Sequence, residues 1–392
     1  MKKRMIADRV YWMGAIDWDR RLFDSLIPLP DGTSYNAYLV EGSEKTALLD
    51  AVDPAMADEL MRQLDGVARV DYLISHHAEQ DHSGTLPLLA KRFPEAKILA
   101  SPKARGMLLD LLDLPETAIT TVTDGETLSL GDKTLKFIHT PWVHWPETMV
   151  TYLEEDKILF SCDLFGSHLA TGDLFAKDQA QVYEAAKRYY AEIMMPFRTI
   201  IQKNLEKIGG LDAQVIAPSH GPVYDKPEWI VDAYRQWVSG APGNVVAVPY
   251  VSMHASVERM VKHLAASLVD RGVRVELFNL AVTDVGKLAM ALVDAGTIVV
   301  GTSTVLNGPH PLALYAAYLA NALKPKARFI SVVGSYGWGG KTVDMLAETL
   351  AGLKAEVLEP VMVKGAPSAD DLAAVDALAE AIAKKHAENG FA

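Results

Sequence analysis

The sequence predicts an α/β protein of two domains, with stacked sheets flanked by helices in the first and a doubly wound, five-stranded parallel sheet in the second. Three observations support this prediction. A chain of 392 residues is longer than one hydrophobic core usually serves. Short β-rich runs extend to about residue 225, whereas from residue 244 apolar runs alternate with helical patterns. The segment SGAPGN (239–244) has the composition of a connection, so we expect domains at residues 1–240 and 244–392.

The strands of the first domain are predicted from short runs of apolar and β-branched residues, with helical stretches between some of them. This mixture is typical of stacked sheets covered by helices. The runs are NAYLV (36–40), TALLD (46–50), DYLIS (71–75), TLKFIHT (134–140), MVTYL (149–153), KILFSCD (157–163) and AQVIAP (213–218).

The strands of the second domain are predicted from continuous apolar runs, which indicate a parallel sheet buried on both faces. Helical patterns separate them, and residues 370–388 read as an amphipathic C-terminal helix. The runs are NVVAVPY (244–250), RVELFNL (274–280), GTIVVGT (296–302), ARFISVVG (327–334) and AEVLEP (355–360).

Composition limits the classes of function. The formal charge of −12 argues against nucleic-acid binding, which depends on concentrated Lys and Arg. No run approaches the roughly 20 apolar residues of a membrane span, and Asp8, Arg9 and Asp17 interrupt any candidate leader peptide. The single cysteine, Cys162, cannot close an intrachain disulfide and fits a reducing compartment. We therefore expect a cytoplasmic protein that binds neither nucleic acid nor membrane.

The segment DYLISHHAEQDHSG (71–84) predicts a metal site, because an apolar strand leads directly into a cluster of potential ligands. His77, Glu79 and Asp81 occupy alternate positions, which in an extended loop would point their side chains the same way. His82 adds a fourth ligand where a helix is expected to begin. One metal would take His77 and Glu79, and a neighbouring metal would take Asp81 and His82.

Two metals need more ligands, and three further residues follow predicted strands. His144 lies in TPWVHWPETM, Asp163 ends the run 157–163, and His220 follows the run 213–218. Asp163 is the expected bridge, because a carboxylate has two oxygens and can reach both ions. No residue is expected to act as a nucleophile, so no catalytic residue is predicted beyond the metal ligands.

Several residues near the predicted ligands are expected to have supporting or packing roles. His76 and His139 are expected to pack or to support the ligands. Cys162 is expected to be a buried thiol whose sulfur points away from the metals, because side chains alternate along a strand. Three residues are expected either to hydrogen-bond to a bound species or to pack in the core: Tyr189, Tyr190 and His168.

The pattern H-x-E-x-D-H, with the distant His144, Asp163 and His220, resembles that of A-type flavodiiron proteins along the full chain. The resemblance implies a metallo-β-lactamase-like αββα sandwich followed by a flavodoxin-like domain. Glu79 stands where zinc hydrolases of this fold commonly have histidine, and the added oxygen donor suits iron. By this resemblance two Fe ions per subunit would be held, sharing Asp163. Members of the family differ in whether the residue at His82 binds, so its role stays open.

A phosphate site is predicted where the strand at 244–250 ends and a helix begins, because helix N-terminal amides and hydroxyls bind phosphate. The absence of G-x-G-x-x-G favours a cofactor with one terminal phosphate, and Ser335 breaks the apparent P-loop in GSYGWGGKT (334–342). The predicted contacts are Ser252, Met253, His254, Ala255, Ser256 and Val257.

Two further loops, 301–310 and 334–340, leave strand ends at the same edge of the predicted sheet and could enclose a flat ring. Together the three loops resemble flavodoxin-type FMN binding. The predicted ring contacts are Ser303, Thr304, Leu306, Asn307, Gly308, Ser335, Tyr336, Gly337, Trp338 and Gly339.

Two ferrous ions and a reduced flavin hold the four electrons that take O₂ to water, and two NO coupling to N₂O need two. We therefore expect an O₂ or NO reductase. The resemblance implies an external donor such as rubredoxin and a head-to-tail homodimer, or a tetramer of such dimers. Two alternatives stay open: a zinc-dependent hydrolase fused to a flavodoxin module, distinguished by tightly bound zinc, and a noncatalytic FMN electron carrier.

Overall fold

A computed structural model of the chain describes residues 2–391. They form two compact units: residues up to Tyr190 together with Phe197–Val238, and Ala191–Pro196 together with the chain from Ser239 onward. Among the described residues, no helix combines the length and the apolar character needed to cross a bilayer.

The first unit contains two large sheets. The first sheet has the order β1 (Arg4–Ala7), β2 (Val10–Trp12), β7 (Tyr38–Glu41), β8 (Thr46–Leu49), β9 (Tyr72–Ile74), β10 (Lys97–Ala100), β11 (Ile119–Thr121). The second has the order β12 (Thr127–Ser129), β13 (Thr134–His139), β14 (Met149–Leu153), β15 (Ile158–Cys162), β16 (Val215–Pro218). Two small sheets pair β3 (Ala15–Asp17) with β6 (Thr33–Tyr35) and β4 (Leu22–Phe23) with β5 (Ile27–Pro28).

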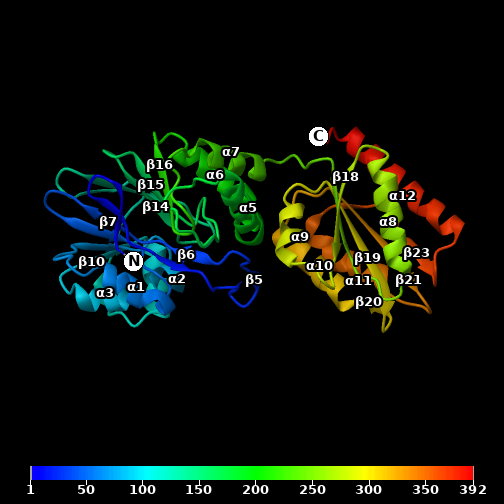
Figure 1. Ribbon diagram of the computed structural model, residues 1–392, viewed down its shortest axis with the longest axis horizontal. Helices are drawn as coiled ribbons and strands as arrows, with labels where there is room; N and C mark the ends of the chain where they lie inside the picture. Colours follow the sequence, from blue (N-terminus) through cyan, green and yellow to red (C-terminus); the bar gives the residue numbers. More distant parts are fainter. Residues whose placement is uncertain (1, 392) are drawn as a thin grey trace. The chain divides into compact units, whose positions relative to one another are not determined.

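Two hydrophobic layers hold this unit together. Between the sheets, side chains that include Tyr38, Phe137 and Phe160 are fully buried. On the outer face of the first sheet, Leu48 and Leu60 belong to a second buried cluster. Helices α1 (Ala57–Gln63), α3 (Leu86–Arg92) and α4 (Pro102–Leu111) contribute side chains to this second cluster and so cover the first sheet. On the side of the second sheet lie α5 (Gln179–Tyr189), α6 (Arg198–Ile208) and α7 (Glu228–Val238) (Figure 1). The expected αββα sandwich is confirmed.

The second unit is the expected doubly wound parallel sheet. Its main strands have the order β18 (Arg274–Asn279), β17 (Val245–Tyr250), β19 (Thr297–Val305), β21 (Phe329–Tyr336), β22 (Glu356–Val357). Helices α9 (Val285–Leu292), α10 (Pro311–Leu323) and α11 (Thr342–Leu350) lie on one face, and α8 (Ser256–Val269) and α12 (Ala369–Glu388) on the other (Figure 1).

Two details of this sheet differ from the sequence prediction. The fifth strand is divided into β22 and β23 (Val361–Lys364), which pair with the start and the end of β21. Pro360 lies between them and has no N–H for the ladder. The expected loop 301–310 is largely strand: β19 continues to Val305, turns at Leu306 and Asn307, and pairs with β20 (Gly308–Pro309).

Candidate metal centre and flavin site

The predicted metal ligands of the first unit come from loops that follow strands. The chain after β9 carries His77 and Glu79 and then enters the short helix α2 (Gln80–Ser83). Glu79 is the N-cap residue of α2, so Asp81 and His82 belong to a helix. The expectation that Asp81 follows an extended alternation is therefore wrong. Asp81 faces the site because it lies in the first turn of α2, and not because side chains alternate along an extended segment.

The structure gathers all seven predicted ligands into two donor groups. Ligand atoms within each group lie within 4.8 Å of one another. The first donor group is His77, Glu79, His144 and Asp163. The second donor group is Asp81, His82 and His220.

Asp163 faces both groups with different oxygens. Its Oδ2 lies 3.5 Å from His77 Nε2 and 3.4 Å from His144 Nε2. Its Oδ1 lies 3.2 Å from His82 Nε2 and 3.3 Å from His220 Nε2. Such a division of one carboxylate between two donor groups is the arrangement that a bridging ligand needs.

The donor groups fit cations. Both carboxylate oxygens of Asp81 and Oδ2 of Asp163 are buried and accept no hydrogen bond from the described chain, so histidine nitrogens at 3.3–3.5 Å are what offsets their charge, which is costly to bury. Burial alone would raise the pKa of Asp163, but His82, His144 and His220 hold it well below its usual range. Burial likewise opposes protonation of His220, yet the carboxylates of Asp163 and Asp81 raise the pKa of His220 to about 10. Metal ions would take the place of these protons.

Two of the predicted histidine ligands, His77 and His220, are oriented by groups that were not predicted from the sequence. Glu147, which is 2% exposed, accepts a hydrogen bond from His77 Nδ1 at 2.7 Å and another from the Ala78 amide at 3.0 Å. His220 Nδ1 lies 2.7 Å from the Ser34 carbonyl oxygen. Each contact leaves Nε2 free for a metal. Glu147 lies in the TPWVHWPETM segment, three residues after His144, but only the fold reveals its direction.

His76, His139 and Tyr190, which were expected near the ligands, make hydrogen bonds outside the two donor groups. His76 uses both ring nitrogens, with Asp50 Oδ2 at 2.7 Å and Thr151 Oγ1 at 2.7 Å, so it supports the loop without facing either group. His139 Nε2 contacts the Val122 carbonyl at 3.1 Å. The Tyr190 hydroxyl donates to the Trp237 carbonyl at 3.2 Å, away from the donor groups.

Tyr189, His168 and Cys162 lie close to the donors. The Tyr189 hydroxyl donates to Asp163 Oδ1 at 2.8 Å, and the His168 ring lies 5.0 Å from that of His220. Cys162 is buried, as expected, but its sulfur lies within 4.8 Å of ligand atoms of Asp50 and His82. At the end of β15, Cys162 leaves the extended conformation with φ +52°.

In the second unit, the three predicted flavin loops lie at one edge of the sheet. The Val251 amide donates to the Gly301 carbonyl at 3.0 Å, and Ser303 pairs with Ser335 across β19 and β21. At the start of α8, the N-cap residue Ala255 adopts φ +64° and has no side-chain acceptor, and the Ser252 hydroxyl accepts from the Glu258 amide at 3.2 Å. This helix end can receive a phosphate.

The predicted flavin contacts differ in exposure. Met253, Leu306 and Trp338 are 52%, 93% and 74% exposed, respectively. Val257 is fully buried in the core of this unit, so its side chain does not face the flavin loops. A hollow of about 340 Å³ is lined by Thr304, Tyr336, Gly339, Gly340, Thr342, Val343, Asp344 and Met362.

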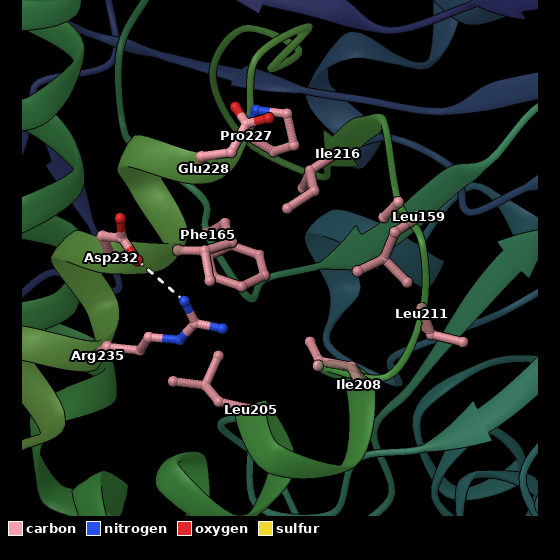
Figure 2. A pocket seen from close by; sticks show the side chains of 13 residues that line it. Leu159, Phe165, Leu205, Ile208, Leu211, Ile216, Pro227, Glu228, Asp232 and Arg235 are labelled. Carbon is pink, nitrogen blue, oxygen red and sulfur yellow. Dashed lines mark hydrogen bonds and ion pairs between the residues drawn. The ribbon is translucent and has the colours of Figure 1, made fainter.

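A further hollow in the first unit, also of about 340 Å³, lies among α6, α7, β15 and β16. Figure 2 shows its apolar lining, which includes Phe165 and Leu205, with the ion pair of Arg235 and Asp232 at one side. None of the seven predicted ligands lines it. It is separate from the donor groups, although Phe165 follows Asp163 by only two residues.

Comparison with known proteins gives matches in both units. Residues 33–221 match the family described as ODP family beta lactamase, and residues 248–375 match the flavodoxin family. The chain is 35% identical over 394 residues to the nitric oxide reductase of Moorella thermoacetica, with 98% of each chain covered.

Two solved structures are similar over nearly the whole chain. The rubredoxin oxygen:oxidoreductase of the anaerobe Desulfovibrio gigas has a TM-score of 0.96 at 32% identity, with 100% of each chain covered. The flavodiiron protein of Giardia intestinalis has a TM-score of 0.93 at 28% identity, with 99% of this chain and 98% of that chain covered.

Proposed function

The chain belongs to the flavodiiron proteins, and from this premise we propose that it reduces dioxygen to water or nitric oxide to nitrous oxide at a di-iron centre, taking electrons from an external donor through FMN. The observation that carries the proposal is Asp163, whose two oxygens face different donor groups. A single-metal site would have no use for this division.

The first iron would be held by His77, Glu79, His144 and Asp163, and the second by Asp81, His82, His220 and Asp163. The Glu79 carboxylate lies 3.0 Å from His77 Nε2 and 3.1 Å from His144 Nε2, so it belongs to the first position. Three carboxylates among seven ligands favour iron over zinc. His82 is included because its Nε2 lies 3.2 Å from Asp163 and 3.4 Å from Asp81.

When bound, two ferrous ions and reduced FMN together supply four electrons. The balances are O₂ + 4 e⁻ + 4 H⁺ → 2 H₂O and 2 NO + 2 e⁻ + 2 H⁺ → N₂O + H₂O. Both reactions consume protons.

The chain's own residues hold the ligand side chains in place and control access to the metal site. Burial and the charge of Asp163 raise the pKa of Tyr189 well above its ordinary value, so its hydroxyl keeps the proton that holds Oδ1. Asp163, His77, His82 and His220 have side chains at most 2% exposed, whereas Glu79 and His144 are 14% and 15% exposed. A gas would therefore approach from the side of Glu79 and His144.

FMN would place its phosphate at residues 252–257 and its ring between the loops at 303–308 and 335–339. The start of α8 suits the phosphate, because the helix dipole is positive there and the Ser252 hydroxyl, which accepts from the Glu258 amide at 3.2 Å, lies beside it. The exposed Trp338 and Leu306 suit the ring edge, where an apolar contact with another protein would also exclude water.

We also propose that the active assembly is a head-to-tail homodimer, alone or paired into a tetramer, with a rubredoxin-type protein as electron donor. Mixing two inactive variants tests the dimer. Asp163→Asn removes the bridge but keeps FMN, and Ser256→Asp repels the FMN phosphate but keeps iron. In a head-to-tail dimer, one mixed site in each heterodimer regains both cofactors, so random mixing restores about a quarter of the activity. Electron transfer within one subunit would restore none.

The test of the activity itself is anaerobic loading with iron and FMN, followed by electrode measurement of O₂ and NO consumption with a reduced donor. Consumption of either gas that requires both cofactors is expected. Full loading without consumption of either gas would disprove the proposal. Tight zinc binding with hydrolytic turnover would instead favour a lactamase-like hydrolase.

A further inference from the structure

The buried polar atoms near the second donor group that have no hydrogen-bond partner within the described chain include Tyr35 Oη and His168 Nε2. Their residues are only 1% and 4% exposed. Buried polar groups are nearly always paired, so an unpaired one calls for a missing partner.

His168 is held from its other nitrogen. Its Nδ1 lies 2.8 Å from Thr33 Oγ1, and the Thr33 hydroxyl donates to the Ser34 carbonyl at 3.3 Å. With its hydrogen used there, Thr33 accepts from Nδ1–H, which leaves Nε2 as a bare acceptor. The ring itself is fixed between His220 and Tyr189, at centroid distances of 5.0 and 4.8 Å.

Tyr35, on β6, approaches His220, whose ring also contacts that of His168. The Tyr35 ring lies 5.9 Å from that of His220 in an edge-on arrangement. Thr33 and Tyr35 are two positions apart on one strand, so their side chains leave the same face. Both residues therefore point to the side where His168 and His220 lie, and Tyr35 offers a hydroxyl donor where His168 offers an acceptor.

We propose that Tyr35 Oη and His168 Nε2 form a subsite for one water or hydroxide beside the second donor group. A single oxygen that carries a proton fits both atoms, because it can accept from the Tyr35 hydroxyl and donate to His168. The inference rests on the proposed function for its role in turnover: water is a product of both gas reactions, and this subsite receives it and relays protons toward the donors. Thr33 is the positioning residue that fixes the direction of His168.

The first test is structural and needs no turnover. A high-resolution crystal structure of the full chain, with and without iron, is expected to contain an ordered oxygen within about 3 Å of both Tyr35 Oη and His168 Nε2. The absence of a shared ordered atom from both states would overturn the subsite, even if the enzyme consumes gas. Its presence would support the subsite even if no gas is consumed.

The second test uses Tyr35→Phe and His168→Phe, with Tyr234→Phe as the matched control. Tyr234 also has a buried, unpaired hydroxyl, but its ring packs against Phe165, Tyr190 and Trp237. The two subsite variants are expected to lose turnover at least about tenfold and to change the solvent isotope effect, with iron and FMN content unchanged. The control is expected to stay within about twofold in turnover.

Thr33→Val separates positioning from folding. It removes the hydroxyl that directs His168 and is expected to lower turnover less than His168→Phe does, with the ordered oxygen displaced in its crystal structure. Unchanged turnover and isotope effect in both subsite variants, or turnover lost only in proportion to lost iron, would overturn the proposed role.

Discussion

Glu147 gives the sharpest prediction, because it contacts one predicted ligand and no other. In Glu147→Gln the side chain keeps its shape and an acceptor oxygen for His77 Nδ1 and the Ala78 amide, but loses its charge. A hydrogen bond to a charged group contributes about 1.5–3 kcal/mol. Loss of such a partner behind a metal-bound histidine lowers metal affinity by about 10–100-fold, or about 1.4–2.7 kcal/mol. The two ranges agree.

The loss of metal affinity in Glu147→Gln should be confined to the position formed by the first donor group. Glu147 directs His77, which belongs to the first donor group, whereas His220 of the second is directed by the Ser34 carbonyl. Anaerobic competition between the metal-free chain and a chelator, followed metal by metal, is expected to give one position weakened about 10–100-fold and the other within about threefold. Glu126→Gln is the control, since Glu126 accepts its hydrogen bonds from Thr123 at an exposed turn. Equal weakening at both positions, or none, would refute the reasoning.

Three further predictions follow from particular contacts. In the metal-free chain, the pKa values of His77, His82 and His144 are raised to about 9 and that of His220 to about 10, despite the opposing effect of burial, because carboxylates surround them. Their stabilisation is complete below about pH 6.5 and is lost as the pH rises through 9 to 10. The midpoint of thermal unfolding should therefore fall over this range, and fall less with metal bound; a flat profile without metal would contradict this. Asn36→Ala leaves the Trp12 indole N–H and the Gly221 carbonyl unpaired and removes one of the two hydrogen bonds to the Pro218 carbonyl, which keeps the Tyr38 hydroxyl, so denaturant titration should find unfolding easier by about 2–4 kcal/mol. The same change should weaken metal binding at the position that includes His220, and unchanged binding there would argue against coupling through this loop. Ser256→Asp places a carboxylate at the first turn of α8, which favours the helix dipole but repels a phosphate, so FMN affinity should fall at least about tenfold while the flavin-free protein unfolds no more easily. Unchanged FMN affinity would mean that the phosphate binds elsewhere.

The strand runs and the order of motifs were predictable because they depend on local periodicity. All seven ligand candidates could be chosen from their positions after apolar runs. Residues that act through tertiary contacts could not be chosen in this way. Asn36 sits inside a predicted strand, and only the pairing of distant segments brings it beneath the His220 loop.

Local geometry also limited the prediction where a strand ends. The sequence favours an extended segment through Asp81, but α2 begins at Gln80. In the second unit, Val257 was chosen with its neighbours for a helix N-terminus, yet its side chain faces the core. A motif identifies the segment that reaches a site, whereas the fold decides which atom of each residue faces it.

The division of the ligands along the chain has a consequence for biosynthesis. When Asp163 has left the ribosome, all four members of the first donor group exist, but the second still lacks His220. Neither group is yet fixed, because β15, which precedes Asp163, pairs with β16, and β16 ends only at Pro218. Iron should therefore enter a domain that is already folded, unlike a zinc finger, in which the metal drives folding. Both donor groups therefore depend on one pairing of distant segments, and a chain that ends before β16 would contain the first group's residues without arranging them.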